Sequence, residues 1–146
     1  MTYCTDQDLL KYRPNILSLG QTDWAEQRQD AYTQINKIIN VRWYLKAAVP
    51  QGFDPVLTAF DPDLVMNDSL KKLECFKTLE LAYMLLMKDS PEADGFERNM
   101  DLFAKKYGEE LNLIVGTIGV DYDWNSDDEL TVDETVLTAP RRLYRS

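Results

Sequence analysis

An acidic stretch late in the sequence has the residue types and spacing of a calcium-binding loop. From Asp121 to Glu134 the chain carries seven carboxylates and no basic side chain. A calcium loop of this kind places side-chain oxygens at positions one, three and five, a backbone carbonyl at seven and a glutamate at twelve. Because alternating oxygens on a tight loop converge on a hard cation, the pattern makes Ca²⁺ a candidate ligand. The residues at these positions are Asp123, Asn125, Asp127, Glu129 and Glu134.

The loop also departs from a complete EF-hand. Position six is glycine in the pattern, and here it is Asp128, which would have to adopt a left-handed conformation that glycine prefers. The segment entering the loop is expected to be extended, and the segment leaving it stops at Pro140. A solvated acidic turn is therefore the expected structure, with Ca²⁺ binding as the alternative.

The end of the sequence reverses the sign of the charge. Residues 135–146 carry three arginines and no acid. Arginine forks can pair with carboxylates on a partner, while a leucine and a tyrosine can fill apolar pockets. A frayed tail is the alternative interpretation. The residues predicted to bind a partner are Arg141, Arg142, Leu143, Tyr144 and Arg145.

The rest of the sequence shows no arrangement of catalytic residues. It has no histidine, which is the commonest general base and metal ligand. Cys4 and Cys75 are far apart in sequence and are expected to be reduced thiols, with Cys75 in the core. The glycines form no phosphate-binding loop, since the short segment 116–119 precedes no predicted helix. We therefore predict no catalytic residue, no enzymatic activity and no cofactor other than the candidate Ca²⁺.

Charge and hydropathy restrict the class of partner. The chain of 146 residues has a formal net charge of −9, a field that repels polyphosphate and argues against ordinary nucleic-acid binding. Its clean apolar runs, such as Leu81–Met87, are too short to span a bilayer. The first residues lack the layout of a signal peptide. We expect a protein of a cytoplasm-like compartment with no membrane segment.

Capping residues and apolar periodicity predict two helices in the first third of the chain. Thr5 reads as an N-cap, with Asp8 completing a capping box, for a helix over residues 6–13. Asp23 begins a second helix that extends to about Lys46. Its buried stripe is predicted from residues at steps of three and four. These residues are Trp24, Ala31, Ile35, Ile38, Ile39 and Trp43.

Further caps predict the remaining helices. Asp61 followed by Pro62 indicates a short helical turn. A helix from Asn67 or Asp68 to about Lys88 follows, and another runs from residues 90–91 to about 111. Among the aromatic residues, Trp24, Trp43 and Tyr83 are expected in the core. Trp124 is expected to be partly exposed in the acidic loop, as an interface anchor.

The hydrophobic pattern changes after residue 112. The β-branched, glycine-bearing stretch from Leu113 to Val120 predicts a strand or an extended arm. The expected protein is mainly α, a bundle of four to five helices over residues 1–112. An extended, partly β C-terminal arm over residues 113–146 completes it, with the acidic loop at 121–134 and the basic peptide at 135–146.

This layout resembles a known protein family. The opening segment Tyr3–Leu10 reads Tyr-Cys-Thr-Asp-Gln-Asp-Leu-Leu, and a helical bundle and an extended C-terminal arm follow it. The arrangement resembles head–tail connector (adaptor) proteins of tailed bacteriophages. In that family a dodecameric ring assembles beneath the portal, and the C-terminal tail docks on the portal.

The resemblance implies a structural protein of the virion, located at the head–tail junction and made in the host cytoplasm. Its partners would be the portal protein ring, neighbouring adaptor subunits in a homo-dodecamer, and a tail or stopper protein. Residues 141–145 would dock on the portal, and acidic residues in the channel would keep passing DNA from adhering. An alternative of a different class is a small regulatory module that binds a cation or a peptide through residues 123–134.

Overall fold

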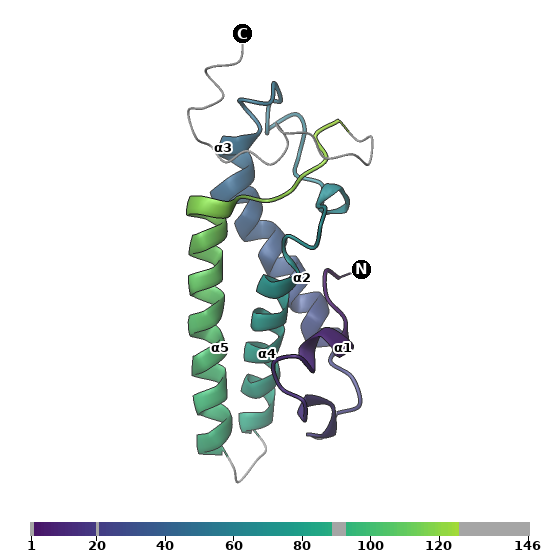
Figure 1. Cartoon of the computed structure of the whole chain (residues 1–146), viewed down its shortest axis with the longest axis vertical. Coiled ribbons are helices and arrows are strands. Elements are labelled where there is room, and N and C mark those ends of the chain that lie inside the picture. Colours follow the sequence, from purple (N-terminus) through teal and green to yellow (C-terminus); the bar gives the residue numbers. More distant parts are fainter. Residues whose placement is uncertain (1, 20, 89–92, 126–146) are drawn as a thin grey trace. The chain divides into compact units, whose positions relative to one another are not determined.

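The computed structural model describes residues 2–19, 21–88 and 93–125, and most of these are helical (Figure 1). The predicted mainly α fold is confirmed. The chain divides into two compact units, Met1–Ile35 with Lys71–Leu111, and Asn36–Leu70 with Asn112–Ser146. Within the described part of the chain, no helix is long and apolar enough to cross a membrane.

Local capping builds helix α1 (Asp6–Leu9) as predicted. The Thr5 hydroxyl accepts a hydrogen bond from the Asp8 N–H at 3.4 Å, and Asp8 Oδ2 accepts one from the Thr5 N–H at 2.8 Å. This reciprocal pair satisfies donors that a helix start leaves open. The α-helix ends at Leu9 rather than at Arg13, because a tight turn follows in which Tyr12 N–H donates to the Leu9 carbonyl.

The predicted second helix forms in three parts. Asp23 Oδ1 accepts from the Ala25 N–H at 3.1 Å, where helix α2 (Ala25–Ile39) begins. A π-helical turn, η2 (Asn40–Tyr44), and the short α3 (Leu45–Ala47) continue it. Both Trp43 and Tyr44 are buried. A π turn is wider than an α turn, and this one accompanies two adjacent aromatic residues that both enter a core.

Helices α4 (Lys71–Lys88) and α5 (Ala93–Leu113) lie side by side (Figure 1). Tyr83 of α4 stacks on Phe103 of α5, with 6.1 Å between ring centroids. The Trp24 indole N–H donates to the Ile16 carbonyl at 3.0 Å, so this core tryptophan is fully satisfied. The core of the first unit comprises Cys4, Leu9, Ile16, Trp24, Cys75, Phe76, Leu79, Ala82, Tyr83 and Phe103.

The predicted start of α4 is wrong. Asn67 and Asp68 do not cap it, because both have left-handed backbones with φ of 57° and 55°, and the helix begins at Lys71. These residue types tolerate that conformation better than most. The turn is fixed further by Ser69, whose hydroxyl donates to the Met66 carbonyl at 2.9 Å and accepts from the Asp121 N–H at 3.0 Å.

The strand predicted over Leu113–Val120 is also wrong. Helix α5 runs to Leu113 and continues as a π turn, η4 (Ile114–Ile118), which stops at Gly119. Ile114 and Val120 are buried, so packing outweighs the β preference of this segment. Most of the predicted C-terminal arm falls on residues 126–146, which lie outside the described residues.

The second unit joins two segments that are distant in sequence. The short helix η3 (Pro62–Leu64) begins where predicted, with Asp61 Oδ1 accepting from the Asp63 N–H at 3.0 Å. Beside it, Val65 and Tyr122 form an isolated antiparallel bridge. Hydrogen bonds from Met66 N–H to the Asp121 carbonyl and from Asp123 N–H to the Leu64 carbonyl, both of 2.8 Å, flank this bridge.

Candidate functional site

Six aromatic side chains gather in the second unit. Tyr44 stacks on Trp124 with an interplanar angle of 12°, and Phe53 stacks on the same indole at 23°. Tyr122 contacts Trp124 edge-on, with centroids 4.6 Å apart. Such pairs add to the energy of simple burial. The members of this aromatic cluster are Trp43, Tyr44, Phe53, Phe60, Tyr122 and Trp124.

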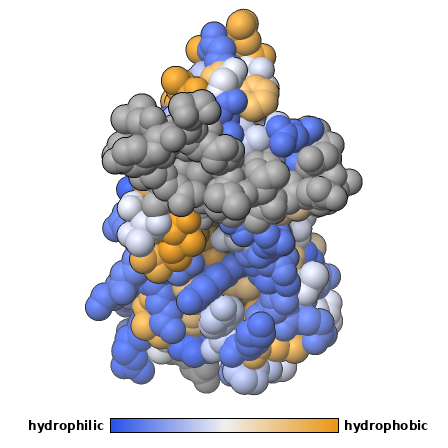
Figure 2. Space-filling model, turned by 45° about the horizontal axis from the view of Figure 1, so that its top comes forward, coloured by the Kyte–Doolittle hydropathy of each residue, from blue (hydrophilic) through white to orange (hydrophobic). Residues whose placement is uncertain are grey.

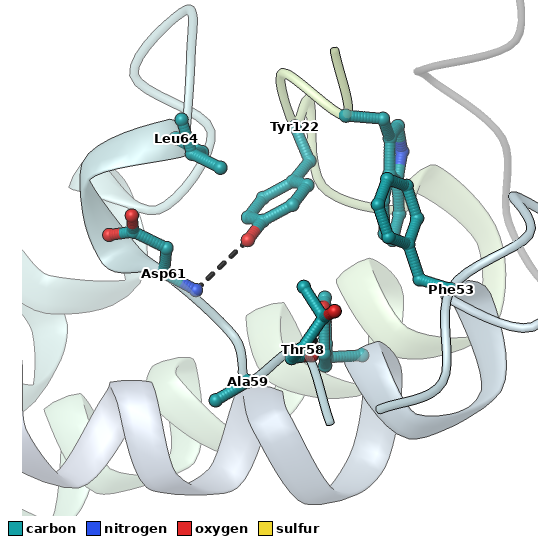
Figure 3. A pocket seen from close by; sticks show the side chains of 8 residues that line it. Phe53, Thr58, Ala59, Asp61, Leu64 and Tyr122 are labelled. Atoms are coloured by element: carbon teal, nitrogen blue, oxygen red, sulfur yellow. Dashed lines mark hydrogen bonds between the residues drawn. The ribbon is translucent and has the colours of Figure 1, made fainter. Parts of the chain in front are cut away.

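A pocket of about 260 Å³ opens on this cluster (Figure 3). Aromatic side chains from three separate segments line much of it, with Thr58 and Asp61 as its polar neighbours. Asp61 is the charged residue of the lining, and it is exposed. The pocket therefore combines apolar ring surfaces with one carboxylate. The aromatic lining comprises Tyr44, Phe53, Tyr122 and Trp124.

Two tyrosine hydroxyls hold the loop that carries Thr58 and Asp61. The Tyr122 hydroxyl accepts a hydrogen bond from the Asp61 N–H at 2.9 Å, as the dashed line in Figure 3 shows. The Tyr44 hydroxyl donates to the Thr58 carbonyl at 2.6 Å. Because Tyr44 lies in η2 and Tyr122 in the segment after η4, the loop is fixed at two points and the pocket is preformed.

The electrostatics of the pocket favour a cation. Burial raises the pKa values of the Tyr122 and Tyr44 hydroxyls, so both remain neutral phenols at physiological pH. The aromatic faces carry negative electrostatic potential, and a cation over such a face is attracted to it. With the acidic residue Asp61 also in the lining, the pocket suits an ammonium or guanidinium group that has an apolar stem.

Two large apolar residues lie exposed next to the pocket in sequence. Val56 is 86% exposed and Leu57 is 83% exposed, directly before Thr58. On the face drawn in Figure 2, hydrophilic residues cover much of the described surface, with hydrophobic patches between them. Adjacent exposed apolar side chains beside a preformed pocket are typical of a docking surface for a protein segment. We call Val56 and Leu57 the apolar ledge.

The structure describes two of the five predicted calcium ligands. Asp123 is only 2% exposed, whereas Asn125 is exposed. The other three, Asp127, Glu129 and Glu134, lie outside the described residues, as do the predicted docking residues 141–145. Within the described ranges no cluster of three or more acidic or cysteine residues could hold a metal ion. The calcium-loop interpretation stays a prediction.

Trp124 does not have the exposure that the sequence suggested. It is 6% exposed, because it packs between Tyr44 and Phe53 instead of projecting from a solvated loop. Its indole N–H has no hydrogen-bond acceptor among the described residues. The other expectations for aromatic residues are confirmed, since Trp24, Trp43 and Tyr83 are all buried.

No sequence pattern indicates the pocket directly. Its aromatic residues come from segments around residues 44, 53–60 and 122–124, which only the fold brings together. A usable signal was the density of aromatic residues in the segments 53–60 and 122–124, which carry no helical period. The predicted site residues lie in the charged segments near the end of the chain, whereas the pocket lies where aromatic side chains from distant segments meet.

A second polar cluster is buried in the first unit. The Cys4 N–H donates to Glu74 Oε2, and the Cys4 thiol is hydrogen-bonded to Cys75. This hydrogen bond and burial raise the pKa of the Cys4 thiol far above its usual range. Because the thiolate is the reactive form, the group is poorly suited to nucleophilic chemistry. Both cysteines are free, as predicted, but the fold makes them neighbours.

Comparisons with known proteins return no relative from which a function could be transferred. No protein-family model matches the chain, and neither the curated proteins nor the solved structures contain a match to it.

Proposed function

We propose that this chain is a structural virion protein, a ring-forming head–tail connector of a tailed bacteriophage. The observation that carries the proposal is the docking surface of the second unit, an aromatic pocket beside the exposed apolar ledge of Val56 and Leu57. A preformed pocket of this kind suits a protein that binds segments of other chains. The mainly helical fold and the opening segment around Thr5 agree with the resemblance to that family.

A ring needs two different surfaces on every subunit. Identical subunits close into a ring through head-to-tail contacts, in which one patch of a subunit meets a different patch of the next. The docking surface is one candidate patch. The arginine-bearing peptide at residues 141–145 is the other candidate, and it is the segment that we propose grips the portal or a neighbouring subunit.

The charge of the chain suits a DNA conduit. With a formal net charge of −9, a ring of many copies presents a strongly negative field. Such a field repels the phosphate backbone, so DNA can pass without adhering to the wall. The proposed role is therefore assembly and conduit formation rather than catalysis.

The proposal is tested by attachment to a portal. The full chain is co-expressed with the portal protein encoded in the same genome, and the purified complex is imaged by electron microscopy. We expect a ring of added density on the portal, which is lost when Arg141–Ser146 is deleted. The matched control replaces the three arginines of that peptide with lysine, which keeps the charge and should retain part of the binding.

Two results would overturn the connector role. One is a chain that never co-purifies with the portal ring under conditions in which both proteins are folded. The other is attachment that is unchanged when Arg141–Ser146 is removed, which would eliminate the docking arm. Circular dichroism of the deletion variant checks that the helical body is intact.

A further inference from the structure

The shape and chemistry of the pocket select a flat cation. Tyr44, Phe53, Tyr122 and Trp124 all line the pocket, so its wall consists largely of aromatic rings. A guanidinium group is planar and stacks on aromatic faces, and its weak hydration lowers the cost of leaving water. A compact ammonium gains less from such a surface.

One acidic residue lies at the edge of the pocket. Asp61 is the charged residue of the pocket lining and is exposed to solvent. Its Oδ1 already accepts the Asp63 N–H, which fixes the orientation of the carboxylate. A guanidinium can add charge-assisted hydrogen bonds to a carboxylate held in this way.

The ligand must also cover apolar surface. The apolar ledge, Val56 and Leu57, directly precedes the pocket residue Thr58. Covering it requires apolar side chains next to the arginine, and a peptide can supply both. A peptide also brings backbone carbonyls, the kind of acceptor that the buried Trp124 N–H lacks among the described residues.

The chain itself contains a peptide with this chemistry. Residues 141–145 read Arg-Arg-Leu-Tyr-Arg, which places a leucine and a tyrosine between arginines. In a chain whose net charge is −9, this is a local concentration of positive charge with apolar anchors. We infer that the aromatic pocket and the apolar ledge of one copy bind residues 141–145 of a second copy, with an arginine in the pocket beside Asp61.

The assignment of the peptide to a second copy follows from ring closure, so this inference rests on the proposed function. A head-to-tail ring places the peptide of one subunit on the pocket of the next. The same contact made within one chain would fill the pocket without joining subunits. Binding of the peptide and association of the chains are therefore measured separately.

The first measurement titrates a synthetic peptide of residues 135–146 into a full-length variant in which Arg141, Arg142 and Arg145 are replaced by glutamate. Its own tail can then no longer compete for the pocket. We expect saturable binding by calorimetry, accompanied by a change in tryptophan fluorescence, because Trp124 lines the pocket. Binding should weaken as salt is added. No heat and no fluorescence change would overturn the inference.

Single substitutions locate the binding site. In the same background, Asp61→Asn keeps the capping oxygen and removes the charge, so we expect the affinity for the peptide to fall by about tenfold. The matched control is Asp63→Asn. This substitution removes an exposed charge two residues from Asp61, on a side chain that does not line the pocket. Equal losses from both substitutions would show general attraction and would overturn the assignment to the pocket.

The second measurement identifies the donor of the peptide. Wild-type chain is examined by sedimentation velocity at concentrations well above the dissociation constant of the peptide. Association that disappears in the Asp61→Lys variant and in the tail glutamate variant, and returns when these two variants are mixed, supports docking between copies. A wild-type chain that stays monomeric would mean that its own tail occupies the pocket, which overturns the second-copy assignment.

The inference and the connector role can fail independently. Peptide binding at the pocket without portal attachment would retain the contact between copies and remove the connector function. Portal attachment with no peptide binding at the pocket would retain the connector function and remove the contact between copies.

Discussion

The backbone N–H of Cys4 donates a 2.5 Å hydrogen bond to Oε2 of Glu74, a fully buried residue of helix α4. This bond fastens the segment before α1 to the middle of the first unit. The other carboxylate oxygen, Oε1, has no partner among the described residues. A buried carboxylate that is only half satisfied is costly in its charged form.

This cost should make the stability of the fold depend on pH. Burial raises the pKa of the Glu74 carboxyl above its ordinary value of 4.5, although Cys4 and Arg28 act in the opposite direction. The folded state therefore holds this proton more tightly than the unfolded state. The resulting stability is fully present below the ordinary pKa and is lost as the pH rises through the raised pKa.

Glu74→Gln removes this loss of stability at higher pH, because glutamine is neutral at every pH. Its side-chain oxygen can still accept the Cys4 N–H. We expect the melting temperature of the variant, relative to wild type, to increase between about pH 4 and pH 7. Glu109→Gln, the same change at an exposed position of α5, should show no such trend. A difference between Glu74→Gln and wild type that does not vary with pH would contradict the assignment.

The cysteine pair gives a prediction about reactivity. Cys4 and Cys75 are both buried, and the pKa of the Cys4 thiol is raised by its hydrogen bond to Cys75 and by burial. We expect neither thiol to react with an aromatic disulfide reagent in the folded protein at pH 8, and both to react in guanidinium chloride. Rapid labelling of the folded protein would show that this cluster opens or carries a thiolate.

Features decided by neighbours in sequence were predictable. The capping box of Thr5 and Asp8 spans three residues, and the turn at Asp61 depends on its own oxygen and the following proline. Each depends on residues within three positions of one another, so residue type suffices to predict it. The strand prediction for Leu113–Val120 failed for the converse reason. Its β-branched residues favour a strand locally, but helix α5 leads into them and burial of Ile114 decides.

The candidate site could not be predicted from residues that are close together in the sequence. Tyr122 and Asp61 are 61 residues apart, and Cys4 and Glu74 are 70 apart. Nothing in the spacing of these residues identifies the pairs, because the fold as a whole determines which segments meet. Charge patterning did identify the acidic and basic ends of the last segment, which is where the calcium-loop and docking hypotheses remain to be tested.

The pocket loop yields a prediction about a single hydroxyl. Tyr122→Phe keeps the ring contacts of Tyr122 but removes the acceptor of the Asp61 N–H. We expect the free energy of unfolding in urea to fall by about 1 kcal/mol. Tyr12→Phe is the control, since its ring contacts Phe76 and its hydroxyl makes no hydrogen bond within the described residues. Equal effects in the two variants would remove the loop-fixing role of the Tyr122 hydroxyl.

Gly119 and Gly108 should respond to alanine in opposite directions. Gly119 ends the π turn η4 with φ of 78° and ψ of −177°, and its N–H donates to the Ile114 carbonyl at 2.8 Å. This backbone conformation is almost restricted to glycine, so Gly119→Ala should lower the free energy of unfolding by about 1–3 kcal/mol. The turn also directs the chain toward Tyr122 and Trp124, so the variant should perturb tryptophan fluorescence.

Gly108 lies inside helix α5, and a Cβ atom added there would meet no atom within 4 Å. Alanine restricts the unfolded chain and favours the helix, so Gly108→Ala should raise the free energy of unfolding by about 0.5–1 kcal/mol. Both variants are measured by urea denaturation monitored by circular dichroism. Destabilisation by Gly108→Ala would mean that α5 is not a continuous helix at this position, and a neutral Gly119→Ala would mean that the chain leaves η4 by another route.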